Sequence, residues 1–352
     1  MIEFVSIQQA GELDAYVARH KHGHFMRSSL WGCVKRDWPW TGIILRDTSG
    51  TIRGTIALLR HDSRLFPSCF FYAPRGPIFD DMTVFSELID AAADYAKAQG
   101  AYMLRIDPEI PETDEGMLAL ANKKGFRLDQ ASDFSLFQPR LCYVSDLTGK
   151  DEVSLASSFQ RSTRQNIHKA LRGPLTVRLG TMYDLDDFMR MMKDTASKNG
   201  FQPRQEAYYR AVLEGLGSAA RLYIAELEGT PVAGAISVIF GETCSFFYSC
   251  SAKGSEKTHV NELLQWHLQT DALRLGCTRF DFRGVIGYPD EQNPHLGLHN
   301  YKRGYGAKFC ASIGQLDLPI HPWLYALSAR LCMSHAASLA AVSPAVSFLT
   351  TL

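Results

Sequence analysis

The feature that most constrains the fold is an internal repeat, because the same order of expected elements occurs twice along the chain. Each copy reads as a glycine-turned β-hairpin, a strand with a loop, a helix and a further strand. The segments are 42–61, 70–79, 84–100 and 101–110 in the first copy, and 221–240, 245–254, 261–276 and 277–285 in the second. Phe71 and Phe247 are 176 residues apart, as are Gly100 and Gly276 at the two helix ends. The repeat predicts an α/β (α+β) chain built from two tandem domains.

The order of elements in each copy resembles the central unit of an N-acetyltransferase-like (GNAT) domain. This resemblance implies two tandem GNAT-like domains, each with a mixed central sheet flanked by helices. We place the first domain at 1–147 and the second at 148–318, because an apolar strand gives way to polar, turn-rich residues near 142–152. A helical tail at 319–352 is expected to pack back on the first domain. Its apolar residues recur at helical spacing, which favours an amphipathic helix over a membrane span: Leu324, Leu327, Leu331, Leu339 and Val342.

Composition limits the classes of function. The 352 residues are 46% hydrophobic and 21% charged, with 37 basic and 37 acidic side chains, so a general polyanion binder is disfavoured and any basic patch is local. The eight cysteines have no paired spacing, and His20, His22 and His24 have no carboxylate or cysteine partner at useful spacing, so we expect no metal. No basic segment precedes an apolar run at the N-terminus, which predicts a cytoplasmic protein.

Residues 278–320 combine an apolar strand, a glycine-rich loop and a cationic turn. Such glycines let backbone approach an anionic ligand, although an isolated charged turn is more often a solvated loop. The motifs Asp281-Phe282-Arg283-Gly284, Gly287, Gly297-Leu298 and Tyr301-Lys302-Arg303-Gly304-Tyr305-Gly306 resemble the C-terminal signature of the FemABX family of non-ribosomal peptidyltransferases. The chain lacks a long charged heptad segment, so it resembles the compact FemX-like form without the coiled-coil arm. Asp281 and Arg283 are expected to form an ion pair that shapes the loop.

A basic stripe is predicted in a stretch that has no acidic residue between Val153 and Tyr183. Its members are spaced by three, four and four residues and would share one helix face: Arg161, Arg164, His168 and Arg172. Lys169 and Arg178 add to the positive field. The segment from Thr163 to Ile167 resembles a segment of the family, and we expect the stripe to bind tRNA phosphates. The alternative is a solvated helix face.

The resemblance also implies residues that bind the acceptor. In the first copy, the order Phe25, Ser28, Ser29, Trp31, Gly32 and Lys35 resembles a family motif, with Ser28 where glutamine is usual. The matching lysine of the family binds a nucleotide-linked muramyl peptide, so Lys35, with Trp31, is expected to do so here. The resemblance places further precursor-binding residues in Tyr102, Arg204, Tyr208, Tyr248 and Arg303. For each tyrosine the alternative is a core aromatic residue with a paired hydroxyl.

The function implied is an aminoacyltransferase that moves an amino acid from aminoacyl-tRNA to the side-chain amine of the peptidoglycan stem peptide. Lys302 is expected to stabilise charge on the ester carbonyl or to contact the tRNA phosphates, and Asp107 to help remove the proton of the amine. No cofactor is needed, because the ester is already activated. The acceptor is UDP-MurNAc-pentapeptide or lipid II, the protein is expected to be a monomer, and its tail is compatible with peripheral contact with the inner face of the membrane.

Two alternatives remain open. One is a GNAT-type acyltransferase that uses acyl-CoA on another amine, and the other is a non-catalytic tandem domain that binds precursor or RNA. A CoA-binding GNAT domain cradles pyrophosphate in an R/Q-x-x-G-x-G/A loop at a helix N-terminus. The corresponding segments here, 75–85 and 251–261, lack that pattern. The GNAT-like scaffold is therefore expected to use a different acyl donor.

Overall fold

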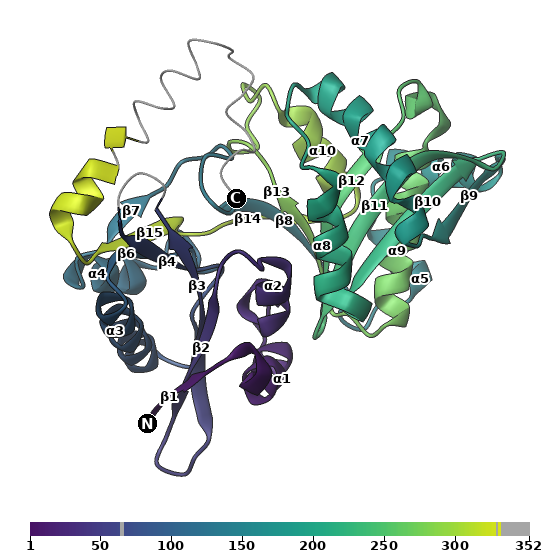
Figure 1. Cartoon of the computed structure of the whole chain (residues 1–352). Helices are drawn as coiled ribbons and strands as arrows, with labels where there is room; N and C mark the ends of the chain where they lie inside the picture. The colour runs from purple at the N-terminus through teal and green to yellow at the C-terminus, as the bar shows by residue number, and fades with distance from the viewer. Residues whose placement is uncertain (64–66, 329, 332–352) are drawn as a thin grey trace. The chain divides into compact units, whose positions relative to one another are not determined.

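The computed structural model describes residues 1–63, 67–328 and 330–331, which form two compact units (Figure 1). Unit 1 contains Met1–Arg140 together with the described residues from Ala311 onward. Unit 2 contains Leu141–Cys310. Each unit is built around its own mixed sheet.

The sheet of unit 1 has the strand order β1-β2-β3-β4-β6-β15-β7, with β5 paired to β3. Helix α3 covers one face, and its apolar residues Val84, Phe85 and Leu88 are buried against Ile56 and Leu58 of β3. Helices α1 and α2 precede the hairpin. The bounds are β1 (Ile2–Val5), α1 (Gly11–Arg19), α2 (Ser29–Val34), β2 (Trp40–Arg46), β3 (Ile52–Asp62), β4 (Cys69–Ala73), β5 (Ile78–Phe79), α3 (Met82–Ala98), β6 (Ala101–Ile106), α4 (Glu115–Lys123), β7 (Arg127–Asp129) and β15 (Gln315–Pro319).

The sheet of unit 2 has the strand order β14-β8-β13-β12-β11-β10-β9. Helices α7 and α8 lie on one face and α9 on the other (Figure 1). Gly234 permits the close approach of α7, since a side chain there would meet the ring of Phe188. The bounds are β8 (Leu141–Asp146), α5 (Glu152–Ser158), α6 (Arg161–Leu171), β9 (Leu175–Leu179), α7 (Leu185–Asn199), α8 (Glu206–Leu216), β10 (Ala220–Leu227), β11 (Thr230–Phe240), β12 (Thr243–Ser251), α9 (Val260–Arg274), β13 (Arg279–Gly284), α10 (Leu296–Gly304) and β14 (Lys308–Ala311).

The predicted repeat is confirmed strand by strand. In unit 1, β2, β3, β4 and β6 are joined by two antiparallel pairings and one parallel pairing. In unit 2, β10, β11, β12 and β13 are joined in the same way. Gly100 and Gly276, which follow α3 and α9, both have left-handed backbone, with φ of 75° and 78°. The two copies therefore share strand order as well as sequence register.

Two strands depart from the predicted domain boundaries. Strand β8, at the end of the first copy, pairs with β13 in unit 2, and β15, at the end of the second copy, pairs with β6 in unit 1. The first unit accordingly ends at Arg140 and resumes at Ala311, whereas the sequence suggested boundaries at 147 and 318. The sequence identified the segment of β8 as an apolar strand, but such a pattern does not identify the sheet that receives the strand.

The described part of the C-terminal tail packs against unit 1. Leu324 and Tyr325 contact a cluster that contains Phe70, Tyr72 and Tyr102. The Tyr325 hydroxyl donates to Asp317 Oδ2 at 3.2 Å. Within the described residues, all helices are too short or too polar to cross a bilayer. The predicted helical positions 339 and 342 lie outside the described residues.

Candidate functional site

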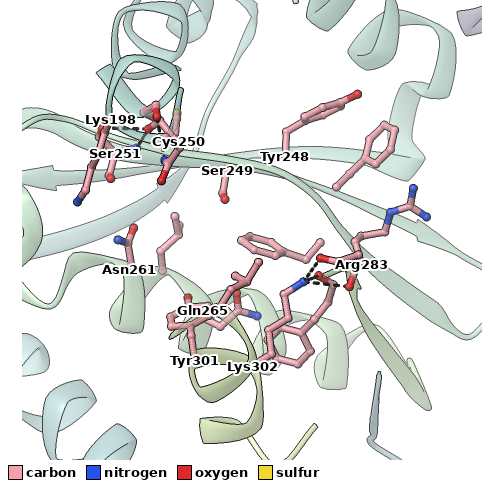
Figure 2. Close-up of a pocket in the computed structure, with 18 residues that line it drawn as sticks. Lys198, Tyr248, Ser249, Cys250, Ser251, Asn261, Gln265, Arg283, Tyr301 and Lys302 are labelled. Carbon is pink, nitrogen blue, oxygen red and sulfur yellow. Dashed lines mark hydrogen bonds between the residues drawn. The ribbon is translucent and has the colours of Figure 1, made fainter. Parts of the chain in front are cut away.

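The candidate site is a cavity of about 440 Å³ in unit 2, at the point where two parallel strands separate. Strands β12 and β13 are paired from Thr243 and Arg279 to Ser245 and Asp281. Beyond that point their residues line the two sides of the cavity, and the ends of α7, α9 and α10 complete it (Figure 2). A cavity of this volume is of the size that binds a small organic ligand.

Strand β13 is irregular at the cavity. Its register with β8 shifts between Asp281 and Gly284, and Arg283 has left-handed backbone with φ of 62°. The backbone N–H of Arg283 donates to Asp281 Oδ1 at 2.7 Å, and the two side chains form the expected ion pair at 4.0 Å. Bulges of this kind change the direction of side chains beside functional sites. Strand β13 therefore bends at Arg283, where the glycine-rich loop begins.

Lys302 stabilises this strand end. Its ammonium donates to the carbonyl oxygens of Phe282, Arg283 and Gly284 at 2.7, 2.9 and 2.7 Å (Figure 2). The side chain is 5% exposed and lines the cavity. All three N–H donors of the ammonium are therefore engaged with backbone, which gives Lys302 a bracing role in addition to its charge.

Two opposing effects set the charge state of Lys302. Burial lowers the pKa of its ammonium to about 7, and nearby Asp281 acts in the opposite direction. The three carbonyl acceptors also favour the protonated form, because they hydrogen-bond to it. With this pKa the ammonium and the neutral amine of Lys302 are both populated near neutral pH, and the hydrogen bonds to the three carbonyl oxygens are made by the ammonium form.

The predicted cationic turn is wrong in its local structure, because Tyr301–Gly304 forms the last turn of helix α10. Lys302 points inward, whereas Arg303 is half-buried and donates to Asn300 Oδ1 on the same helix. The glycines serve packing: a side chain at Gly304 would meet Thr163 Oγ1 at 2.6 Å, and one at Gly306 would meet the Ser158 carbonyl at 2.7 Å. Neither glycine approaches the cavity, whose lining residues do not include them.

Two tyrosines predicted to bind the precursor are linked beside the cavity. Tyr248 on β12 lines it, and its hydroxyl donates to the Tyr208 hydroxyl on α8 at 3.1 Å. The Arg204 guanidinium lies 5.4 Å from the centre of the Tyr208 ring. Burial raises the pKa of both phenols, so both hydroxyls stay protonated near neutral pH. The sequence prediction placed these three residues together, and the structure does so.

The glycine-rich loop is held by two residues that the sequence did not single out. Asn293 donates to the carbonyl oxygens of Ile286 and Tyr288 at 2.8 and 2.7 Å. His299 is fully buried, and its Nε2 lies 3.1 Å from the Ile286 carbonyl oxygen while its Nδ1 lies 3.1 Å from Tyr143 Oη. Gly287 is required here, because a side chain would meet Asn293 Nδ2 at 2.8 Å. In the sequence these are two polar residues near a glycine-rich loop. Their positions alone do not reveal which groups they contact.

Asp107 lies at the end of β6 in unit 1 and is only 3% exposed. Its Oδ2 accepts from the Tyr72 hydroxyl at 2.6 Å, and its Oδ1 accepts from the backbone N–H of Arg75. Burial raises the pKa of its carboxyl to about 6, although the Arg75 charge and the Tyr72 hydrogen bond oppose this shift. Asp107 therefore titrates near neutral pH, but both oxygens are already hydrogen-bonded.

The other predicted residues of unit 1 lie on two elements. Lys35 follows α2, and its ammonium lies 5.4 Å from the centre of the Trp31 ring. Trp31 itself is buried. Tyr102 on β6 belongs to the aromatic cluster with Phe70 and Tyr72, which matches the core role considered for the tyrosines. Lys35 is half-buried, and its role in binding the precursor stays a prediction.

The basic stripe lies on α6 and its C-cap. Arg161, His168, Lys169 and Arg172 are exposed, and the opposite face of the helix is buried. Arg164 differs, because its guanidinium donates to the backbone carbonyls of Ser157 and Phe159 before the helix. The stripe therefore offers four exposed basic side chains rather than the predicted continuous row.

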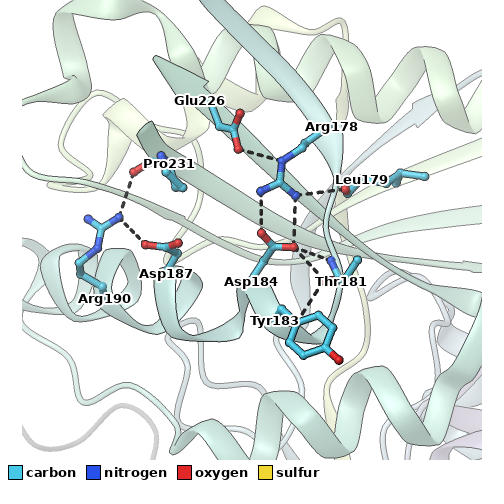
Figure 3. A network of polar contacts seen from close by, with 9 residues as sticks. All are labelled: Arg178, Leu179, Thr181, Tyr183, Asp184, Asp187, Arg190, Glu226 and Pro231. Carbon is cyan, nitrogen blue, oxygen red and sulfur yellow. Dashed lines mark hydrogen bonds and ion pairs between the residues drawn. The ribbon is translucent and has the colours of Figure 1, made fainter. Parts of the chain in front are cut away.

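Arg178 does not contribute to that stripe as expected. It forms ion pairs with Asp184 at 2.6 Å and with Glu226 at 2.8 Å (Figure 3). The hydrogen bond from Arg178 lowers the pKa of Asp184 to about 2, so this carboxylate is charged at all ordinary pH values. The positive charge of Arg178 is therefore offset locally, and the network ties β9 to β10 and to the start of α7.

Comparisons with known proteins agree with the fold. A sequence model described as the FemAB family matches residues 9–230 and 228–332. The chain is 24% identical over 392 residues to the lipid II:glycine glycyltransferase of Staphylococcus haemolyticus, covering 90% of this chain and 93% of that protein. The Staphylococcus aureus protein of the same name is 24% identical over 394 residues, with the same coverage.

Solved structures show the same architecture. The crystal structure of FemX superposes with a TM-score of 0.83 at 23% identity, covering 93% of this chain and 99% of that one. A tandem GNAT protein from the clavulanic acid biosynthesis pathway superposes with a TM-score of 0.53 at 11% identity, covering 92% and 99%. These likenesses confirm the two tandem GNAT-like domains predicted from the repeat.

Proposed function

The chain belongs to the FemAB family, and we propose that it transfers an amino acid from aminoacyl-tRNA to the stem peptide of a peptidoglycan precursor. Its relatives named as glycyltransferases support a transferase activity of the aminoacyl type. The observation that carries the proposal is the cavity of unit 2, where β12 and β13 separate beside the buried cation Lys302. The acceptor is the side-chain amine at position three of a UDP-linked or lipid-linked stem peptide.

The reaction converts an ester into an amide. The neutral amine attacks the ester carbonyl, a C–N bond forms, the C–O bond to the ribose breaks, and the proton lost by the amine ends on the ribose oxygen. An alkyl amine has a pKa of about 10.4, so the site must either select the neutral amine or remove a proton from the ammonium before attack. Asp107, with its pKa raised to about 6, is the residue that the sequence suggested for removing the proton, but both of its oxygens already accept hydrogen bonds, so we assign it a bracing role and the site selects the neutral amine.

Lys302 supports the transition state in two ways. Its hydrogen bonds fix the cavity wall formed by Phe282, Arg283 and Gly284. The positive charge of its ammonium form, on a side chain that is only 5% exposed, favours the negative charge that develops on the carbonyl oxygen. This second effect acts through space and leaves the three backbone hydrogen bonds intact.

The remaining predicted residues divide between the two substrates. We propose that seven residues bind the precursor: Lys35, Trp31 and Tyr102 in unit 1, and Arg204, Tyr208, Tyr248 and Arg303 in unit 2. The exposed residues of the α6 stripe are proposed for tRNA phosphates, to which Arg161, His168, Lys169 and Arg172 offer four basic side chains. A lipid-linked acceptor would bring the protein to the membrane surface.

Single-turnover transfer tests the proposal. The purified protein is mixed with radiolabelled aminoacyl-tRNA and either UDP-MurNAc-pentapeptide or lipid II, and amide product is quantified. We expect product with aminoacyl-tRNA and none with acetyl-CoA as the donor. Product from acetyl-CoA alone would assign the acyl-CoA reaction, and binding of precursor without product from either donor would assign a non-catalytic role.

A further inference from the structure

The wall of the cavity formed by α9 contains a carboxamide without a hydrogen-bond partner. Gln265 is 1% exposed and lines the cavity, and neither its Oε1 nor its Nε2 has a partner among the described residues. An unpaired buried amide lowers the stability of the fold. Asn261, one helical turn earlier, lines the same cavity, so two carboxamides occupy one face of α9 (Figure 2).

The surroundings of Gln265 select a class of ligand. Partly exposed aromatic rings of Phe246, Phe247 and Tyr301 line the cavity with it. None of the described lining residues is acidic, which disfavours a bound ammonium group as the partner of the amide. Aromatic faces combined with a neutral donor and acceptor are the groups by which proteins bind an unstacked nucleobase.

Adenine is the base that fits a carboxamide best. The Gln side chain can accept from the adenine 6-amino group and donate to a neighbouring ring nitrogen, which makes a bidentate pair. Every tRNA ends in adenosine, and the aminoacyl ester is attached to that nucleoside. The cavity volume of about 440 Å³ falls in the range of small-molecule sites and suits a nucleoside that carries an amino acid.

We propose that Gln265 reads the adenine of the terminal adenosine of the acyl donor and is a specificity-determining residue for that donor. This inference rests on the proposed function for the identity of the donor. It places the base on the α9 side of the cavity and leaves the ester to face the β13 wall. The unpaired amide is then satisfied only when the donor is bound.

Gln269 provides a matched control on the same helix. It lies one turn after Gln265, is fully buried, and also has both amide atoms unpaired. It does not line the cavity. Methionine is similar in size to glutamine but has no amide, so replacing either glutamine removes a buried unpaired polar group. We therefore expect Gln265→Met and Gln269→Met each to raise the melting temperature by about 2–4 °C.

The first measurement is transfer from aminoacylated RNA minihelices that end in adenosine or in purine riboside, which lacks the 6-amino group. We expect the wild type and Gln269→Met to prefer adenosine by about 10-fold to 100-fold in kcat/KM. Gln265→Met should transfer from both RNAs at the same low rate. A Gln265→Met variant that keeps the preference for adenosine would overturn the inference.

The second measurement separates this inference from the proposed function. Equilibrium binding of free adenosine and of purine riboside is compared for the same three proteins, without any transfer. A preference for adenosine that is lost only in Gln265→Met supports base reading even where no aminoacyl-RNA is turned over. Equal binding of both nucleosides to the wild type contradicts it, as does a Gln265→Met variant that keeps the preference for adenosine.

Discussion

The same pair of parallel strands ends differently in the two units. In unit 1, β4 and β6 stay paired as far as Ala73 and Ile106, whereas in unit 2 the pairing of β12 and β13 stops at Ser245 and Asp281. The offset of 176 residues aligns Tyr72 with Tyr248 and Asp107 with Arg283. The two copies therefore keep the same scaffold. The aligned positions at the ends of β6 and β13 carry opposite charges, and only β12 and β13 separate early.

Each strand end satisfies its polar groups by a different means. In unit 1 the Asp107 carboxylate accepts from Tyr72 and from the backbone of Arg75, so an anion closes the end. In unit 2 three backbone carbonyls at the end of β13 accept from Lys302. Buried carbonyls need a donor. The ammonium of Lys302 supplies it in unit 2, beside the cavity.

The largest effect is expected from Lys302→Ala, which removes both the brace and the charge at the open end. The rate of transfer should fall by about 100-fold to 1000-fold, with kcat and kcat/KM falling together. Precursor affinity should be nearly unchanged. Single-turnover transfer and direct precursor binding check this, with the exposed Lys308→Ala as control. Transfer at the wild-type rate would show that the open end does not depend on its cation.

Lys35→Ala should behave in the opposite way. Loss of a charged contact in unit 1 is expected to weaken precursor binding by about 10-fold to 100-fold, while transfer at saturating precursor is retained. Titration calorimetry with UDP-MurNAc-pentapeptide measures the affinity, and the exposed Lys21→Ala serves as control. A fall in kcat with unchanged precursor affinity would contradict the proposal that Lys35 in unit 1 binds the precursor.

Reversing two charges on α6 should affect the donor alone. The double variant Arg161→Glu and Arg172→Glu is expected to weaken tRNA binding by about 10-fold at 0.15 M salt and to reduce its salt dependence, because fewer phosphate contacts release counterions. Binding is measured by fluorescence anisotropy over a range of salt concentrations. The pair Lys97→Glu and Lys123→Glu makes the same charge change on unit 1. Equal losses in both double variants would leave α6 a solvated face.

The smallest effect on transfer is expected from Asp107→Asn, which tests whether the closed end needs its charge. The pKa of Asp107 is raised from 3.8 to about 6, so its contribution to folding stability is fully present below about pH 4 and is lost as pH rises through about 6. The fall in free energy of unfolding over that window should be smaller in Asp107→Asn by on the order of 1 kcal/mol.

Urea denaturation at pH 4.5 and 7 measures the stability term, and single-turnover transfer at pH 7 measures the rate. We expect a change in rate of at most about fivefold, because the two oxygens of Asp107 hold Tyr72 and the backbone of Arg75. A loss of about 100-fold would instead make Asp107 the base for the acceptor amine.

The repeat predicted the fold because strand, helix and glycine positions are local properties of the sequence. It did not predict the exchange of β8 and β15, since pairing partners far apart in the chain leave no local signal. The end of α10 was mistaken for a turn because Gly304 and Gly306 follow two charged residues, a combination that is common in surface turns. Burial of Lys302 against three carbonyls overrides that composition.

The site was predicted unevenly for a similar reason. Arg204 and Tyr208 were assigned from a segment that resembles the family, Tyr248 was expected on a strand facing the same cleft, and the structure brings the three together. Gln265 was missed, because a glutamine inside a helical pattern carries no signal until its burial and lack of partners are seen. Contacts of that kind depend on tertiary packing.

The exchange of strands between the two units affects the order in which they can fold during synthesis. Strand β15 lies between β6 and β7 in the sheet of unit 1, yet it is encoded after all of unit 2. Domains usually fold from the N-terminus as the ribosome releases them. Here the first unit to emerge can close its sheet only after residue 319 has left the ribosome, so unit 2 has all its strands available before unit 1 has its own.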